Sequence, residues 1–170
     1  MYNKSLDVNK TIAGTNDTPL YVACANGSYN VSSILLDLPS ININNGCLFA
    51  TCRNGNTQLV KLLLNKSSID VNKGRNDNCV TPLLISLKKG HVEIANALLN
   101  HESIDINTAR IDNGETPLLI ACQKGHVEII NTLLNHDSID VNKGRNDNCE
   151  TPLLNACENG HLEIVNALLN

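Results

Sequence analysis

The sequence predicts an all-α solenoid in which short helix pairs stack side by side. Gly90, Gly125 and Gly160 are separated by 35 residues each, and a Thr-Pro-Leu triplet recurs in phase with them. Regular spacing of this length is typical of repeat architectures, in which each unit is one supersecondary motif. Hydrophobic residues make up 42% of the 170 residues and aromatic residues only 2%, so the core should be aliphatic.

The fourth unit shows how each predicted element arises. Thr116 is a good N-cap, because its hydroxyl can accept a hydrogen bond from a free backbone N–H of the first turn. Pro117 suits the first helical position. A short apolar helix is predicted from about 118 to 124. Gly125 should end it, since glycine adopts a left-handed conformation without steric penalty. A second helix is predicted from about 126 to 134.

This second helix carries an apolar stripe that it cannot bury alone. Val127, Ile130, Leu133 and Leu134 lie on one helical face. Copies that stack side by side bury such stripes against one another, so each unit should contact only its neighbours. The segment 138–149 has no helical period and is rich in Asn, Asp and Gly, which predicts an excursion that contains a turn.

One domain is predicted over residues 1–170. Its units lie at about 7–37, 41–65, 70–100, 105–135 and 140–170. The second unit is shortened, because Gly27 and Gly55 are only 28 residues apart, and the missing residues fall between Asn44 and Leu48. The shortening predicts a gap in the row of excursions, at which a partner could enter or the stack could bend.

The units share the pattern TPLL-x-A-C-x-x-GH-x-E-I-x-x-x-LLN-x-x-SID-(V/I)-N. This pattern resembles the ankyrin repeat, and the resemblance covers essentially the whole chain. It implies an L-shaped stack of antiparallel helix pairs with β-hairpin fingers that project at right angles. The units exceed the family's usual length of about 33 residues. Leu84, Leu119 and Leu154 replace the usual His after Thr-Pro-Leu.

Composition bears on partners and location. A net charge of −4 and few aromatic residues disfavour nucleic-acid binding, which uses a basic footprint and stacking aromatics. No apolar run approaches the ~20 residues of a membrane span, and residues 1–10 contain no signal-peptide core. Seven cysteines, an odd number, indicate reduced thiols. We therefore expect a cytoplasmic protein that binds neither nucleic acid nor membranes.

The recurring histidines do not predict a metal site. His91, His126 and His161 should step along the stack by a helix-packing distance of about 8–10 Å. A metal ion needs its ligands about 2 Å away. The family resemblance implies instead that each histidine hydrogen-bonds the turn at the start of the second helix. We expect no metal, no cofactor and no catalytic constellation, and hence no enzymatic activity.

Most cysteines occupy a packing position. Cys24, Cys52, Cys122 and Cys157 recur near the end of the first helix, where Leu87 stands in the third unit. A free cysteine behaves as a small hydrophobic residue.

Cys79 and Cys149 differ, since they stand where the fourth unit has Gly114, near the finger tips. We expect them to be at least partly exposed. They lie two units apart, too far for a disulfide, which needs Cα atoms within ~7 Å. A thiol-based redox switch is therefore an alternative function.

The fingers place Arg75, Arg110 and Arg145 in one row, each followed two positions later by an aspartate. Two interpretations remain open. In the first, each Arg pairs with the Asp of its own finger, which contributes little stability on an exposed surface. In the second, the row of Arg side chains faces an acidic partner.

The finger sequence KGRNDNC occurs twice, at 73–79 and 143–149, whereas the middle finger differs. There Ile111 replaces Asn76 and Asn146, which puts an apolar side chain at the tip. The substitution favours a central contact with a partner. Recent duplication of a two-unit block explains the repeated sequence equally well.

The predicted function is non-catalytic protein–protein interaction through the finger tips and the exposed face of the first helices. That helix face is basic around Arg53, Lys88 and Lys89 and acidic at Glu158. The predicted contact residues are Arg75, Asn76, Lys88, Lys89, Arg110, Ile111, Glu115, Gln123, Lys124, Arg145, Asn146 and Glu150. A targeting or autoinhibitory segment of a larger enzyme is the alternative.

The last unit lacks a polar outer face of the kind that terminal repeats usually carry. No such cap follows Leu168 and Leu169. We expect either that the chain is part of a longer protein or that something covers this face. The chain is otherwise expected to be a monomer.

Overall fold

The computed structural model describes residues 6–15, 17–74 and 79–170. These residues form ten α-helices and no β-strand. In chain order the helices are α1 (Pro19–Ala25), α2 (Tyr29–Leu36), α3 (Cys47–Asn54), α4 (Thr57–Leu64), α5 (Pro82–Lys89), α6 (Val92–Leu99), α7 (Pro117–Lys124), α8 (Val127–Leu134), α9 (Pro152–Glu158) and α10 (Leu162–Leu169).

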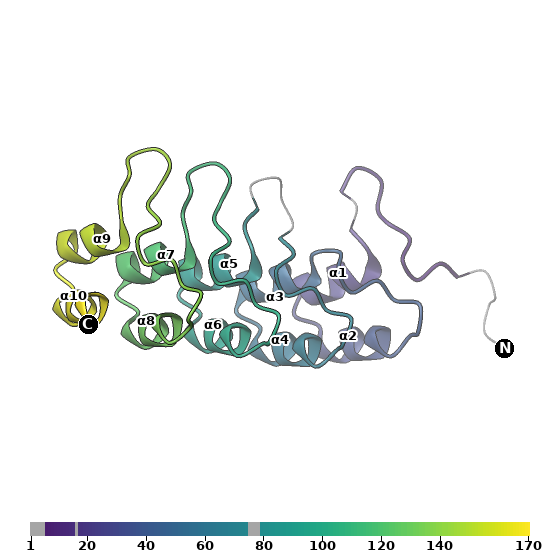
Figure 1. Cartoon of the computed structure of the whole chain (residues 1–170). Helices are drawn as coiled ribbons and strands as arrows, with labels where there is room; N and C mark the ends of the chain where they lie inside the picture. The colour runs from purple at the N-terminus through teal and green to yellow at the C-terminus, as the bar shows by residue number, and fades with distance from the viewer. Residues whose placement is uncertain (1–5, 16, 75–78) are drawn as a thin grey trace.

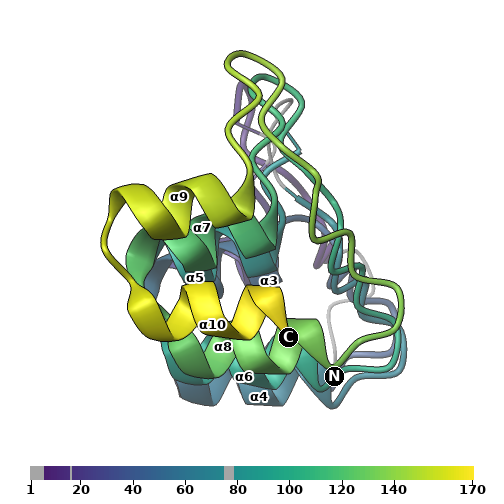
Figure 2. The ribbon, with the colours of Figure 1, turned by 60° about the vertical axis from the view of Figure 1, so that its left-hand side comes forward.

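The helices form two layers, as Figure 1 shows. The odd-numbered helices make an inner layer, in which each packs against the next from α1 to α9, and the even-numbered helices make a parallel outer layer. The fingers rise beyond the inner layer, as seen in the more nearly end-on view of Figure 2. The predicted all-α solenoid of stacked helix pairs is therefore confirmed.

Four inner helices begin at a Thr-Pro pair, as the sequence predicts. The hydroxyl of Thr116 accepts a hydrogen bond from the Leu119 N–H at 3.2 Å, and Thr81 accepts one from the Leu84 N–H at 3.3 Å. A cap of this kind stabilises a helix by about 1 kcal/mol. The exception is α3, which has no side-chain cap. It begins after Gly46, and this glycine adopts a left-handed backbone conformation.

Asparagine side chains tie successive units together. Asn72 donates from Nδ2 to the Ser103 carbonyl at 2.7 Å, and its Oδ1 accepts from the Asp105 N–H at 2.8 Å. Asn9, Asn44 and Asn107 make the equivalent pair of bonds to the unit that follows each of them. The Asn of the recurring Asp-(Val/Ile)-Asn motif is thus a bridge between units.

Apolar burial along the outer layer is broader than one stripe. Ile130 and Leu133 of α8 are fully buried, as predicted, but so is Ile129, which the predicted stripe omits. An outer helix inside the stack contacts the helices on both sides and its own inner helix. Apolar residues of an outer helix are therefore covered from three directions, whereas the predicted stripe accounts for packing on only one helical face.

The fingers are hairpin-shaped loops without regular strands among the described residues. In the fourth unit the Arg110 N–H donates to the Glu115 carbonyl at 3.0 Å, and the Gly114 N–H donates to the Arg110 carbonyl at 2.9 Å. These bonds close a tight turn. Of the β-hairpin that the family resemblance implies, only the turn at the tip is therefore present. No finger rises from residues 44–46 before α3, and the row of fingers has a gap there (Figure 1).

Candidate functional site

A groove of about 500 Å³ runs across three consecutive inner helices, at the base of the middle finger. Because equivalent residues of stacked units lie side by side, one helical face repeated three times makes a continuous surface. Its lining residues come from α3, α5, α7, the segment before α5 and the finger that precedes α7. They are Phe49, Arg53, Val80, Ile85, Lys88, Lys89, Arg110 and Lys124.

The floor of this groove is apolar. Phe49, Val80 and Ile85 are each largely buried by packing, yet each presents an edge to the groove. Sequence reasoning does not single out these residues as functional. For two of them the sequence spacing could have indicated a role. Arg53 stands four positions after Phe49, and Lys89 stands four positions after Ile85, so each cation lies on the same helical face as the apolar residue before it.

The rim of the groove is cationic. Arg53, Lys89 and Lys124 are exposed, and none has a carboxylate partner in the described part of the chain. Each stands in the last turn of its helix. The helix dipole there favours positive charge. Stacking repeats this arrangement from one helix to the next, so the cations gather along one edge.

Glu115 is the acidic group beneath this rim. Its carboxylate lies 3.8 Å from Lys88 Nζ and 3.4 Å from an Arg110 guanidinium nitrogen, and the residue is buried. That Glu115 contacts a partner stays a prediction, and the structure shows what the carboxylate contacts within the chain. Its carboxylate faces the neighbouring cations and holds Lys88 and Arg110 in place, because a buried charge needs compensating partners.

The arginines of the fingers pair within their own fingers. Arg110 Nε donates to Asp112 at 3.0 Å, and Arg145 Nε donates to Asp147 at 2.9 Å. The hydrogen bond from Arg110 holds the pKa of Asp112 below its ordinary value. Of the two interpretations of the Arg row, local pairing is what the structure shows at these two positions. Arg75 and Asn76 lie outside the described residues.

The middle and last fingers touch each other. The Asn146 N–H donates to the Asn113 carbonyl at 2.9 Å. Gly114 has φ 73°, and a Cβ atom there would lie 2.6 Å from Asn146 Oδ1. Ile111 projects from the tip with 65% of its surface exposed. The middle and last fingers are therefore joined, and Ile111 presents an apolar side chain at the tip of the middle finger.

The remaining predicted contact residues differ in accessibility. Gln123 is exposed near Lys124 on α7, and Asn146 is exposed at its finger tip. Glu150 is half-buried. Asn148 donates to its carboxylate at 3.3 Å, and the Arg145 guanidinium lies 3.9 Å away.

Two of the three repeated histidines, His91 and His161, pack against glycines of the preceding unit. A Cβ at Gly55 would meet the His91 ring at 2.8 Å, and one at Gly125 would meet the His161 ring at 2.9 Å. The expected hydrogen bond is absent at all three positions in the described residues, and Nε2 of His126 is buried without a partner. The rings of His91 and His161 therefore fill the space between units. No cluster of metal ligands occurs in the described ranges.

The cysteines divide by exposure. Cys52 and Cys122 are fully buried, and burial raises the pKa of each thiol to about 12, which makes them unreactive. Cys79 and Cys149 are exposed and have positive φ values of 52° and 57°. Cys157 is exposed in the structure, so the prediction that it packs in the core is wrong for this residue.

These features define a repeat protein of stacked helix pairs with a grooved inner face. Residues 42–110 and 103–170 match the family model for ankyrin repeats, described as three copies. The chain belongs to the ankyrin-repeat family. Ankyrin repeats are in general protein–protein interaction modules. No curated protein matches the sequence. In the described part of the chain, no helix has the length and apolar character needed to cross a membrane.

Proposed function

We propose that this chain is a non-catalytic interaction module that holds an acidic segment of a partner protein in the groove across α3, α5 and α7. The observation that carries the proposal is the row formed by Arg53, Lys89 and Lys124, whose charges no carboxylate neutralises in the described residues. A cationic edge of this kind steers an acidic partner and fixes its orientation.

The apolar floor indicates a second requirement for the partner. Phe49, Val80 and Ile85 offer a surface of aliphatic and aromatic edges between the cations. Burial of apolar area supplies most of the favourable free energy in protein association. The partner segment should therefore combine Asp or Glu with one or two large apolar side chains at the centre.

The shortened unit leaves one end of the groove open. Phe49 and Arg53 belong to α3, and no finger rises in front of that helix. The middle finger lines the other end of the groove with Arg110, and Ile111 is exposed on the same finger. We propose that the partner segment enters at α3 and ends against this finger.

A displayed peptide library, selected on the immobilised 170-residue chain, tests this function. The wild type should enrich acidic peptides with central apolar residues. The variant Lys89→Glu/Lys124→Glu should lose them, since it reverses two charges on the groove. The matched control is Lys61→Glu/Lys66→Glu, which makes the same change in charge. Lys61 lies on α4 and Lys66 just beyond it, in the outer layer. The exposed Lys61–Glu93 pair contributes little, and the half-buried Lys66 pairs with Asp37 and donates to the Leu36 carbonyl.

Enrichment of peptides without acidic residues would refute the proposal. Equal loss of binding in both charge-reversed variants would also refute it, because the effect would then report net charge and not the groove. Circular dichroism on all three chains checks that they fold alike.

Two further roles are compatible with the same groove. Within a larger enzyme, an acidic segment held here would act in targeting or autoinhibition. A thiol switch requires Cys79 and Cys149, which are exposed on the fingers. Binding by Cys79→Ser/Cys149→Ser should then stop responding to oxidant. We propose a cytoplasmic location, where these thiols stay reduced.

A further inference from the structure

The unpaired cations of the groove recur once per inner helix. Lys89 and Lys124 stand at the same place in consecutive units, directly before the glycine that ends α5 or α7. Arg53 stands one position earlier in α3, and all three side chains line the groove. The position of Lys89 is taken in α3 by Asn54, which donates to the Ala25 carbonyl at 2.7 Å. Because packed helices lie about 8–10 Å apart, the cations form a row with a step of about that length.

The apolar floor follows the same step over two of these helices. Phe49 of α3 and Ile85 of α5 each present an edge to the groove. Each stands four positions before the cation of its own helix, on the same helical face. A partner segment that runs across α3, α5 and α7 must therefore repeat its side chains with a step close to the distance between the helices.

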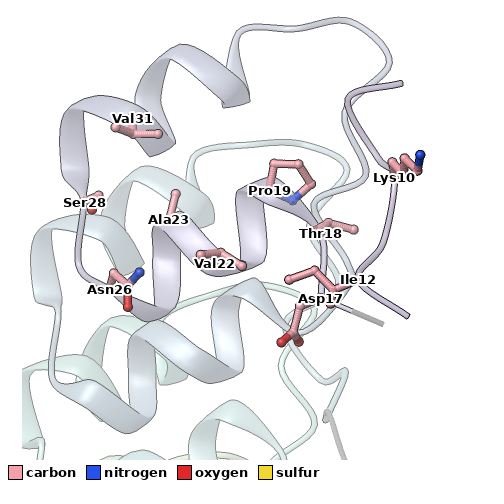
Figure 3. A pocket seen from close by; sticks show the side chains of 10 residues that line it. All are labelled: Lys10, Ile12, Asp17, Thr18, Pro19, Val22, Ala23, Asn26, Ser28 and Val31. Atoms are coloured by element: carbon pink, nitrogen blue, oxygen red, sulfur yellow. The ribbon is translucent and has the colours of Figure 1, made fainter. Parts of the chain in front are cut away.

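An apolar hollow alone does not provide such a row. A hollow of about 430 Å³ lies at the first finger, where Ile12, Val22 and Val31 line it (Figure 3). Among the described residues that line this hollow, Lys10 is the only cation, and Asp17 lines the same hollow. The repeated cations therefore belong to the groove across α3, α5 and α7, and Lys10 offers a control position outside it.

Three regular conformations of a partner segment can be compared with this step. In a polyproline II helix three residues make one turn and rise about 9.3 Å, so every third side chain points the same way. In a β-strand the side chains of one face repeat every ~6.6 Å, which is too short. In an α-helix a face repeats after two turns, or about 10.8 Å, which is slightly too long. The polyproline II helix matches the row best.

Backbone hydrogen bonding and width separate these conformations further. A β-strand binds by pairing with an exposed sheet edge, and the described residues contain no strand. The backbone of a polyproline II helix is solvated and needs no such edge. An α-helix ~10 Å wide and ~20 Å long has a volume of about 1,500 Å³, whereas the groove has about 500 Å³. Both comparisons favour the narrower polyproline II segment.

We propose that the acidic partner segment lies in the groove as a polyproline II helix with Asp or Glu at every third position. The inference rests on the proposed function and specifies the conformation and spacing of the partner. One face of the segment sets its carboxylates opposite Arg53, Lys89 and Lys124. A second face sets apolar side chains on Phe49 and Ile85. The third face points to solvent, where proline fits because its ring fixes φ close to the polyproline II value.

Fluorescence anisotropy with labelled synthetic peptides tests the inference on the 170-residue chain. The first peptide consists of three Glu-Leu-Pro triplets. The second contains the same nine residues with Glu at every second position, and the third is an alanine-rich helix with three Glu residues spaced by two turns. The wild type should bind the triplet peptide roughly tenfold more tightly than the other two, because two charge pairs fall out of register in those peptides.

A charge-pair cycle places the segment on the stack. Lys124→Gln should weaken binding of the triplet peptide roughly threefold. In this variant, replacing the terminal Glu that faces α7 by Gln should have no further effect, whereas the same replacement should weaken binding to the wild type. Lys10→Gln removes the same charge at the hollow of Figure 3 and should bind as the wild type does. Circular dichroism checks that the variants fold.

Equal affinity for the triplet and the reordered peptide overturns the inference but leaves the proposed function intact, since charge is then recognised without register. Tighter binding of the helical peptide also overturns it. So does a loss of affinity in Lys10→Gln as large as that in Lys124→Gln, because the effect then reports net charge. If none of the acidic peptides binds, the proposed function fails and the inference fails with it.

Discussion

Asn72 and Asp105 are joined across two units, because the Asn72 carboxamide accepts the Asp105 N–H at 2.8 Å while it donates to Ser103. The bond does not involve the aspartate side chain. That side chain instead accepts from the Asn107 N–H at 2.9 Å, within its own unit. One short motif therefore caps its own turn and receives the bridge from the previous unit.

Asn72→Ala should lower the free energy of unfolding by about 1–2 kcal/mol, because two hydrogen bonds between units are lost. Urea unfolding followed by circular dichroism measures the change. Asn142→Ala is the matched control and should change stability by less than about 0.5 kcal/mol at low protein concentration. Equal effects in the two variants would show that the bridge contributes nothing.

Leu119→Ala and Leu154→Ala should differ strongly, although the residues occupy one repeat position. Leu119 is 2% exposed, and its truncation leaves a cavity, so the expected cost is about 2–5 kcal/mol. Leu154 is 46% exposed, and its truncation should cost about 1 kcal/mol or less. Chemical denaturation of dilute samples gives both values. Similar costs would contradict the described packing of α9.

Gly114 and Cys149 occupy the same finger position in consecutive units, so each can be replaced by the other residue type. Cys149→Gly should stabilise the chain by about 0.5–1 kcal/mol, since a non-glycine residue at positive φ is strained and glycine is not. Gly114→Cys should destabilise it by at least ~1–2 kcal/mol, because the new Cβ would approach Asn146 Oδ1. Thermal unfolding compares the two. A destabilising Cys149→Gly would contradict the left-handed conformation.

Asp105 should titrate below the ordinary range of an aspartate. The Thr108 hydroxyl donates to its carboxylate at 2.6 Å and is the main cause of the lowered pKa. Because the folded-state pKa is lowered, Asp105 contributes stability above the unfolded-state value of about 3.9. That contribution is lost as pH falls through the folded-state pKa.

Thr108→Val should therefore move the pKa of Asp105 upward, toward the ordinary value. Carboxyl chemical shifts, followed by NMR across an acid titration, report this pKa directly. Thr132→Val is a suitable control, because in the described part of the chain the Thr132 hydroxyl bonds only the Glu128 carbonyl, within α8. An unchanged pKa in Thr108→Val would contradict the hydrogen bond.

The fold is largely predictable because its signals are local. The hydroxyl of Thr116 and the ring of Pro117 act within one turn, and Gly125 acts on its own φ angle. The observed α7 and α8 differ from the predicted ranges by one residue at each start. Periodicity then supplies the stacking, because an apolar stripe repeated in phase has only the neighbouring copies to pack against.

The groove is much less predictable. Lys89 and Lys124 can be named from sequence because they precede the glycines that end their helices. Phe49 and Val80 cannot, since they meet only when α3 and the segment before α5 are stacked. Glu115 is the opposite case, a residue that the sequence suggests is at the surface and that the structure buries. As a charged residue beside a finger it predicts a surface contact, yet Lys88, from the previous unit, helps to cover it.

The sequence by itself determined the repeat period, the helix pairs and the shortened second unit, because caps, left-handed glycines and apolar spacing act over a few residues. Only the tertiary structure decided which identical residues are buried and which charges are paired. Leu119 and Leu154 have the same sequence context and opposite environments. The difference lies in the presence of a neighbouring unit, and burial and electrostatic compensation depend on such neighbours.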